Sequence, residues 1–366
     1  MTRLQEVETK LERIRDFMSS RGLDAVVLNR TINFQWLTAG ADSHVVIDTD
    51  TGAVRVVITA DSQHIITNNI EAARQEDEEI GDLPFEIDFM NWHDENPEAM
   101  LAQIVEGRIA SDGPWPQGAE ILDEPLARLR WSLLEPEIAR YRELGRITAQ
   151  ALGEVAREIE PGMSEHEIGA KLAAKLIAQN VIVSVLLIAA DERIYKYRHP
   201  IPTDNRLERQ AMLVIGARKW GLDISATRLV HFGKLPTELA AKHQAVCQID
   251  AAFISETRPG AAVRDIFAKG LAAYEANGYP DEWKLHHQGG ATGYAPRDYK
   301  GTMECPETVL ENQAFAWNPS ITGTKSEDTI IAMADQTEVL STDEQWPMLE
   351  VEYAGKKMAR PDILVR

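Results

Sequence analysis

One sequence pattern occurs twice in the chain, and this repetition limits the fold more than any other feature. Residues 158–180 read EIEPGMSEHEIGAKLAAKLIAQN, and residues 256–278 read ETRPGAAVRDIFAKGLAAYEANG. Both passages contain a helix end, a Pro-Gly pair and a second amphipathic helix. The matched positions are Pro161 with Pro259, Ile168 with Ile266 and Lys171 with Lys269. Because the copies are 98 residues apart, too far for a solenoid, the pattern predicts a duplicated half-domain with a pseudo-twofold axis. Chance similarity is the alternative, since Pro-Gly often follows a helix.

The first third of the chain reads as a small α/β unit. A helix with apolar residues at helical spacing closes at Gly22, and a strand follows at residues 24–28. Two β-branched runs joined by a polar turn predict a hairpin over residues 44–59. At 366 residues the chain is long for one core, so we predict a first domain of residues 1–132.

The second predicted domain, residues 133–366, begins with a long helix. Pro136 is well placed to start this helix, which ends before the first Pro-Gly pair. Ser164 and Glu167 then form a capping box for the next helix. Taken together, the patterns predict a mixed α/β (α+β) fold.

Composition excludes several classes of protein. The formal net charge is −20, which argues against nucleic acid and anionic membrane as partners because both need a basic face. No stretch is apolar and long enough to cross a membrane. Cys247 and Cys305 are the only cysteines, so neither a disulfide framework nor a zinc-type cysteine cluster is expected. We expect a cytoplasmic protein.

Short motifs stand in a fixed order beside the repeat. They are NFQWLTAG at 33–40, WGLDISATRLVHFG at 220–233, HHQGG at 286–290, WNPS at 317–320 and KSEDTII at 325–331. Together they resemble the pita-bread family, which includes methionine aminopeptidase, prolidase, aminopeptidase P and creatinase. The resemblance covers almost the whole chain. It implies a creatinase/prolidase-like N-terminal domain followed by a pita-bread catalytic-type domain.

The resemblance also implies where metal ligands would stand. Metal-dependent members hold two divalent ions with two Asp, one His and two Glu, since adjacent dications need several hard oxygen donors. The corresponding positions here are Val214, Ser225, His287, Asn318 and Glu327. Valine cannot coordinate, and serine and asparagine are weak neutral donors. We therefore expect the two-ion centre to be lost, and we predict no metal ion and no other cofactor.

Asp223 offers an alternative to complete loss of the metal. It lies two residues before Ser225 and shares its face if the segment is a strand. A single-ion site made by Asp223, His287 and Glu327 is therefore the other interpretation.

Creatinase cleaves a C–N bond without a metal, so the resemblance implies a metal-independent hydrolase or lyase of the creatinase type. The substrate is then a small, carboxylate-bearing nitrogen compound. His199 is the general acid/base, because histidine moves protons near neutral pH. His287 and Glu327 orient a polar or cationic group, and Arg297 holds a carboxylate through its guanidinium.

Further side chains are assigned to the same pocket. The substrate-binding candidates are Asp223, Thr227, Asn318 and Tyr294, and Trp220 is expected to line the pocket. Thr227 stands where creatinase has a guanidinium-binding glutamate, which leaves the particular substrate open. If His286 and His287 lie on one strand, His286 points the other way and is structural.

Two other functions fit the same pattern. One is an Xaa-Pro peptidase with a remodelled metal site, and the other is a non-catalytic pita-bread protein that binds a peptide or partner. Retention of His199, His287 and Glu327 favours chemistry over binding alone. The resemblance also implies a homodimer in which residues 33–44 lie near the partner's active site.

Overall fold

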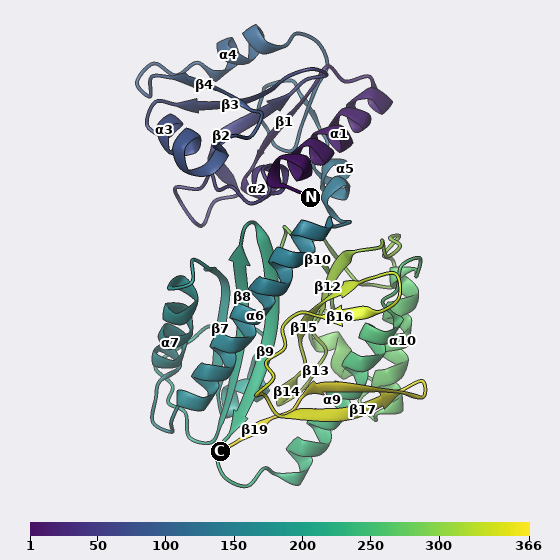
Figure 1. The fold of residues 1–366 in the computed structure, drawn as a ribbon. Helices are drawn as coiled ribbons and strands as arrows, with labels where there is room; N and C mark the ends of the chain where they lie inside the picture. Colours follow the sequence, from purple (N-terminus) through teal and green to yellow (C-terminus); the bar gives the residue numbers. More distant parts are fainter. The chain divides into compact units, whose positions relative to one another are not determined.

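Two units make up the chain in the computed structural model, which describes residues 1–366: Met1–Glu137 and Ile138–Arg366 (Figure 1). The division falls in the first turn of α6 (Glu135–Glu158), a few residues after the boundary expected from the sequence. No helix is both long enough and apolar enough to cross a membrane.

Unit 1 is built on a six-stranded sheet in the order β4-β3-β2-β1-β5-β6. Its strands are β1 (Ala25–Arg30), β2 (Thr51–Ile58), β3 (Gln63–Asn68), β4 (Glu86–Met90), β5 (Ile109–Ser111) and β6 (Glu120–Ile121). Its helices are α1 (Arg3–Arg21), α2 (Thr31–Leu37), α3 (Ala72–Arg74), α4 (Pro97–Ile104) and α5 (Asp123–Ala127), with a π-helix at Gln75–Ile80 and a 3₁₀ turn at Arg128–Arg130. The central strand β1 pairs antiparallel with β2 and parallel with β5.

Local rules account for the first helix of unit 1. Thr2 and Gln5 form a capping box at the start of α1. Gly22 ends the helix with φ of 61°, a left-handed conformation that favours glycine. The predicted end of this helix is confirmed.

The hairpin predicted over residues 44–59 is wrong in its first arm. The observed hairpin joins β2 to β3, and residues 44–49 form no strand. Val45, Val46 and Ile47 are 63%, 54% and 65% exposed. A strand of unit 1 would bury at least one face, so three consecutive exposed aliphatic residues do not belong to its sheet.

Unit 2 begins with two helices and a four-stranded sheet that is antiparallel except for the parallel pair β19–β9. The helices are α6 and α7 (Glu165–Ile177), and the short helix α8 (Glu192–Lys196) follows the first strand. The sheet has the order β19-β9-β8-β7, with β7 (Ile182–Ala190), β8 (Gln210–Lys219), β9 (Leu222–His231) and β19 (Leu364–Val365). Ser164 and Glu167 cap α7 as predicted.

The rest of unit 2 repeats this plan. Helices α9 (Thr237–Glu256) and α10 (Val263–Ala276) precede a sheet in the order β11-β10-β12-β15-β16. Its strands are β10 (Gly289–Thr292), β11 (Tyr299–Lys300), β12 (Gln313–Trp317), β15 (Asp328–Ala332) and β16 (Thr337–Val339). Small additions are a 3₁₀ turn at Glu282–Leu285 and the pairs β13 (Ser320–Ile321) with β14 (Thr324–Lys325) and β17 (Met348–Tyr353) with β18 (Lys356–Pro361). Figure 1 shows α6 and α7 with the first sheet and α9 and α10 with the second.

The duplicated helix pair predicted from the sequence is present. The Pro-Gly pairs follow α6 and α9, and Gly162 and Gly260 have φ of 96° and 86°. Each pair of helices is accompanied by antiparallel strands, as the repeat predicts.

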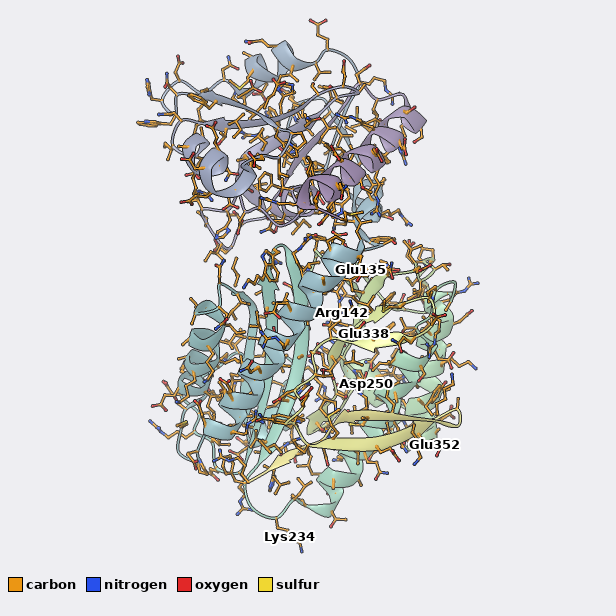
Figure 2. All side chains as sticks on the ribbon, viewed as in Figure 1. Glu135, Arg142, Lys234, Asp250, Glu338 and Glu352 are labelled. Carbon is orange, nitrogen blue, oxygen red and sulfur yellow. The ribbon has the colours of Figure 1, made fainter.

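Buried ion pairs fix the two sheets of unit 2 against each other. Arg228 of β9 pairs with Asp328 of β15 at 2.9 Å. Arg360 of β18 pairs with Asp328 and with Asp250 of α9, both at 2.6 Å. Figure 2 labels Asp250 inside the unit. These contacts hold β15 beside β9. As a result, Glu327, which directly precedes β15, lies within hydrogen-bonding distance of Thr227 on β9.

Candidate functional site

The hairpin β8–β9 carries two of the expected ligand positions. Trp220 and Gly221 form its turn with φ of 54° and 81°, the backbone that a tight two-residue hairpin turn requires. In the resulting register Arg218 pairs with Asp223, Gly216 with Ser225 and Val214 with Thr227. Residues two apart on a strand share a face, so Asp223 and Ser225 of β9 lie on one face, as expected.

Asp223 forms an ion pair with a cationic side chain of the same hairpin. Its side chain is buried, and Arg218 Nη2 lies 3.3 Å from its carboxylate. Burial raises the pKa of Asp223, and the Arg218 guanidinium opposes that rise. The Tyr141 hydroxyl of α6 donates a short hydrogen bond to the Asp223 carbonyl, a contact that the sequence did not reveal.

Glu327 is likewise buried beside a cation. Lys325 Nζ lies 2.7 Å from its carboxylate, and the Thr227 hydroxyl donates to the same oxygen at 2.6 Å. Burial works to raise the pKa of Glu327, but Lys325 and Thr227 bring it below the usual value. Lys325 was missed in the sequence, although its place two residues before Glu327 on extended chain puts both side chains on one face.

Arg297 is mainly an internal cation. Its Nη1 donates to the carbonyls of Gly290 at 2.6 Å and Ala316 at 3.0 Å, and the side chain is half-buried. Burial lowers the pKa of Arg297, while the nearby carboxylates of Glu327 and Asp223 raise it. These backbone contacts engage Nη1, and the expected role of Arg297 in holding a substrate carboxylate stays a prediction.

The two-ion centre implied by the resemblance does not fit these residues. We call Asp223, Ser225, Asn318 and Glu327 the carboxylate centre. Its two carboxylates each have a protein cation, and Val214 packs with Met212 and Leu229 in an apolar cluster. Asn318 is buried and its Oδ1 has no hydrogen-bond partner. A pair of dications needs several anionic donors, which this set does not supply.

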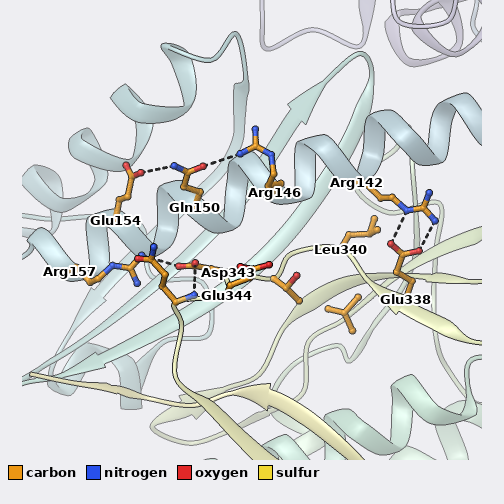
Figure 3. A pocket seen from close by; sticks show the side chains of 12 residues that line it. Arg142, Arg146, Gln150, Glu154, Arg157, Glu338, Leu340, Asp343 and Glu344 are labelled. Carbon is orange, nitrogen blue, oxygen red and sulfur yellow. Dashed lines mark hydrogen bonds and ion pairs between the residues drawn. The ribbon is translucent and has the colours of Figure 1, made fainter.

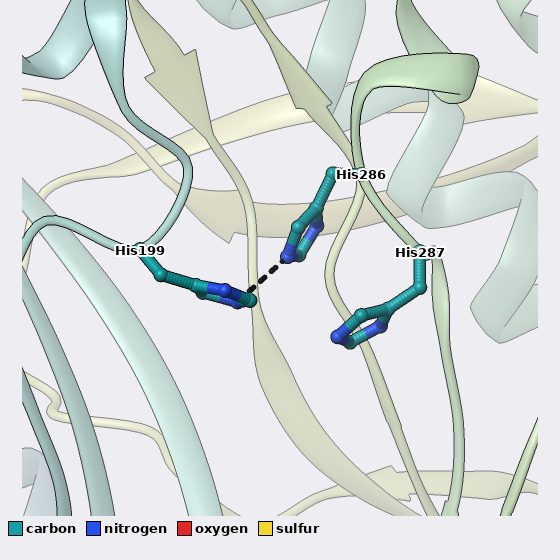
Figure 4. A group of neighbouring side chains, drawn as sticks. All are labelled: His199, His286 and His287. Atoms are coloured by element: carbon teal, nitrogen blue, oxygen red, sulfur yellow. Dashed lines mark hydrogen bonds between the residues drawn. The ribbon is translucent and has the colours of Figure 1, made fainter.

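The single-ion alternative of Asp223, His287 and Glu327 does not form a group either. Among all His, Cys, Asp and Glu side chains, only His199, His286 and His287 bring three donor atoms together, within 4.8 Å of one another. We call these three the imidazole cluster (Figure 4).

The imidazole cluster joins two loops. His199 follows α8, and His286 and His287 lie between the 3₁₀ turn and β10. The Nε2 atoms of His286 and His199 are 2.9 Å apart, and the rings of His286 and His287 stack at 4.3 Å. The prediction that His286 points away was wrong, because β10 begins only at Gly289 and the two histidines are not on a strand.

All three imidazoles are held in their neutral form. Burial lowers the pKa of His286 to about 2, and the charge of Lys325 adds to this effect. Burial, followed by the charge of Arg297, lowers the pKa of His287 to about 4. The pKa of His199 is also lowered by burial and then by Lys325. Neutral rings near pH 7 offer lone pairs for accepting protons or for coordination.

A cavity of about 440 Å³ adjoins the cluster. His286 and His287 lie in its wall, and its apolar lining comes from Phe267, Trp283, Leu285 and Met303. Its lining includes neither Tyr294, which is fully buried, nor Trp220, which lies in the hairpin turn under Lys219. The expectation that these two rings line the substrate pocket stays a prediction.

A larger surface cavity of about 630 Å³ lies between α6 and residues 338–345 (Figure 3). Its charged side chains neutralise one another: Arg142 binds Glu338 through two 2.8 Å contacts, and Arg157 pairs with Asp343 at 3.0 Å. It contains none of the residues of the imidazole cluster or the carboxylate centre.

Sequence comparisons divide the chain at the same place as the fold. The profile described as Metallopeptidase family M24 matches residues 139–336. The profile described as Creatinase/Prolidase N-terminal domain matches residues 10–144. A search of curated protein sequences found no match.

Solved structures share the fold over nearly the whole chain. The prolidase from Pyrococcus horikoshii OT3 is 18% identical, with a TM-score of 0.77 and coverage of 92% of this chain and 99% of that chain. The Xaa-Pro dipeptidase from Bacillus anthracis is 16% identical, with a TM-score of 0.76 and coverage of 98% and 100%. The N-terminal domain of FACT complex subunit SPT16 from Cicer arietinum is 14% identical, with a TM-score of 0.70 and coverage of 93% and 96%. At these identities the likeness shows the fold, and the predicted fold class is confirmed.

Proposed function

Because this chain belongs to metallopeptidase family M24, we propose that it hydrolyses the C–N bond of small, carboxylate-bearing amides, with Xaa-Pro dipeptides as the leading class. The working centre is a remodelled one, in which the imidazole cluster replaces the carboxylate centre. The observation that carries the proposal is the position of neutral imidazoles in the wall of an apolar cavity.

The cavity supports a substrate with an apolar ring or side chain. Trp283 and Phe267 stand edge to face at 6.0 Å and give it aromatic walls. A proline ring is compact and apolar and suits such walls. The prolidase and Xaa-Pro dipeptidase names of similar structures point to the same class.

The position of Lys300 supports a substrate that carries a carboxylate. It directly precedes Gly301 of the cavity wall, its side chain is exposed, and its charge acts on His287. It forms no ion pair, whereas Lys325 and Arg218 are paired. An unpaired cation beside a cavity is suited to a carboxylate, so Lys300 takes the role first given to Arg297.

Hydrolysis adds water across the C–N bond: the oxygen goes to the carbonyl carbon, and a proton goes to the leaving nitrogen. A neutral imidazole can accept the proton of water and return it to the amine. His199 is the most exposed ring of the cluster, and its Nε2 lies 2.9 Å from that of His286 in the cavity wall, so we assign it this role.

A metal-independent reaction of the creatinase type is the second candidate. It is favoured by the ion pair between Lys325 and Glu327, which leaves the carboxylate centre electrically satisfied without a metal ion. In this version His199 alone is the general acid/base, and His287 and Glu327 orient the substrate.

A substrate screen tests the proposal. Purified protein is incubated with Xaa-Pro dipeptides, matched dipeptides without proline, and small amides and amidines, each with and without a chelator. We expect release of free proline, faster than from the matched dipeptides. Turnover of amidines alone, unaffected by chelator, would favour the creatinase-type reaction. Binding without turnover of any compound would favour a non-catalytic protein and contradict the proposal.

Assembly and compartment are further proposals. We propose a homodimer, supported by the exposed Val45, Val46 and Ile47, which directly follow the segment expected to face a partner. We propose a cytoplasmic location, supported by two buried free cysteines. Light scattering that gives one chain per particle would contradict the dimer, and cell fractionation tests the location.

A further inference from the structure

We infer that the imidazole cluster is a binding site for one transition-metal ion, held by His199, His286 and His287. The inference deepens the proposed function, on which it rests for its place in catalysis, because it identifies what the remodelled centre binds. It moves the metal away from the positions that the family resemblance implies, since only His287 belongs to both sets.

Geometry is the first argument. Three nitrogens bound to one tetrahedral ion at ordinary Zn–N lengths are about 3.3 Å apart. Here the donors lie within 4.8 Å of one another, and the closest pair is 2.9 Å apart. Small changes in the side-chain torsion angles bring the three nitrogens to coordination distance. Figure 4 shows the three rings pointing toward one another from two loops.

The hydrogen bonding of His286 is the second argument. This ring is only 9% exposed, and its Nδ1 has no hydrogen-bond partner. Its Nε2 lies 2.9 Å from the Nε2 of His199, so one of the two neutral imidazoles donates its N–H to the lone pair of the other. A buried ring with these poor contacts is costly unless it binds something. A metal ion held by both Nε2 atoms would take the place of this hydrogen bond, with the proton of each ring on Nδ1.

One contact opposes coordination weakly. The Gly289 amide donates a long 3.3 Å hydrogen bond to His287 Nδ1. Coordination through Nε2 places the proton on Nδ1 and breaks this bond. Loss of one long hydrogen bond is a small cost beside three metal–nitrogen bonds.

The charged groups around the cluster allow a dication. Lys325 is paired with Glu327 at 2.7 Å, and Arg198 is paired with Glu282 at 2.9 Å. Arg297 is near the carboxylates of Glu327 and Asp223. Lys300 is the unpaired cation of this group, and solvent screens its repulsion because its side chain is exposed.

The donor set identifies the class of metal. Three neutral imidazoles and no carboxylate suit Zn²⁺, and also Co²⁺, Ni²⁺ or Cu²⁺, rather than Mg²⁺ or Ca²⁺. Three protein donors leave one tetrahedral position open, as catalytic zinc sites do. The adjoining cavity of about 440 Å³ lets a small ligand reach that position.

Metal titration of the chelator-treated full chain tests the inference without any substrate. Zn²⁺ binding is followed by calorimetry, and Co²⁺ binding by its visible absorption. We expect one equivalent per chain and a Co²⁺ spectrum of tetrahedral type. His199→Ala, His286→Ala and His287→Gln should each weaken binding by more than the roughly 10–100-fold that loss of an outer partner costs.

Matched variants make the outcome decisive. His166→Ala removes an exposed histidine of α7 and should bind as wild type does. Asp223→Asn and Glu327→Gln alter the carboxylate centre and should weaken binding by less than the cluster variants do. Circular dichroism checks folding, and if His286→Ala unfolds, the more exposed His287→Gln carries the test. Failure of wild type to take up Zn²⁺ or Co²⁺ would overturn the inference, as would binding that survives the cluster variants and is lost in Asp223→Asn or Glu327→Gln. If no metal binds but dipeptides are still cleaved in the presence of chelator, the metal site is wrong and the peptidase proposal holds. If metal binds at the cluster but no dipeptide is cleaved, the metal site holds and the peptidase proposal is wrong.

Discussion

The carboxylate centre and the imidazole cluster belong to the same unit but differ in whether their side chains have oppositely charged partners. In the carboxylate centre the protein supplies its own cations, because Arg218 pairs with Asp223 and Lys325 pairs with Glu327. In the imidazole cluster no ring has a carboxylate within ion-pairing distance, and Nδ1 of His286 has no partner at all.

This difference explains how a two-ion centre can disappear without loss of the fold. Removing two dications would leave carboxylates buried and unpaired, which is strongly unfavourable. Here the carboxylates that remain are neutralised, and Val214 contributes to an apolar cluster instead. Both sites have buried polar atoms without a hydrogen-bond partner, Asn318 Oδ1 in the carboxylate centre and His286 Nδ1 in the cluster, but only the cluster has no cation paired with its members.

The largest expected effect comes from the cluster. His199→Ala should lower kcat by about 10²–10⁴-fold, or about 3–5 kcal/mol of barrier, because the group that handles the proton or holds the ion is lost. Steady-state kinetics on the best dipeptide measure this effect, with His166→Ala as control. A His199→Ala enzyme that keeps most of its turnover would place the chemistry elsewhere.

The next effect belongs to the carboxylate centre and concerns stability. Lys325→Met should lower the free energy of unfolding by about 3–5 kcal/mol, because Glu327 is left buried without its main cation. Urea unfolding measures the change. The double variant Lys325→Met with Glu327→Met should recover most of the loss, and a loss below about 1 kcal/mol in the single variant would show that the pair is not buried as described.

A smaller effect is expected beside the cluster. Lys300→Met should raise KM for a dipeptide about tenfold with little change in kcat, because a charged hydrogen bond to the substrate carboxylate is removed. Lys284→Met is the matched control, since Lys284 lines the same cavity but pairs with Asp281 at 2.6 Å. Equal KM values for the two variants would show that Lys300 does not bind the substrate carboxylate.

The smallest expected effect is on stability, when His286 of the imidazole cluster is replaced. His286→Phe should change the free energy of unfolding of the metal-free protein by no more than about 1 kcal/mol, since an apolar ring of similar shape replaces one with incomplete hydrogen bonds. Thermal and urea unfolding after chelator treatment provide the measurement. A loss as large as that of Lys325→Met would mean that His286 is a structural core residue.

The sequence revealed the parts of the fold that local rules control. Gly22, the capping box of α7 and the two Pro-Gly pairs were predicted because each depends on neighbours within a few residues. Residues 44–49 were misread as a strand because their β-branched composition suits strands, while burial of such a run depends on tertiary partners that they lack.

The site was harder to predict because it depends on contacts between distant segments. His199 and His286 meet across 87 positions, and no local pattern brings them together. His286 was expected to point away from His287 if both lay on one strand. That condition is not met, because β10 begins only at Gly289, where a Cβ would lie 2.1 Å from the Ala316 carbonyl oxygen. Arg218 and Lys325 were overlooked, although the hairpin register and the two-residue spacing both contain the signal.

The most direct test of the account is anomalous diffraction from crystals grown with Zn²⁺ and measured at the zinc absorption edge. The account predicts one anomalous peak per chain among His199, His286 and His287, within about 2.0–2.1 Å of their ring nitrogens. A peak beside Asp223 and Glu327 instead, with Arg218 and Lys325 displaced from them, would contradict it.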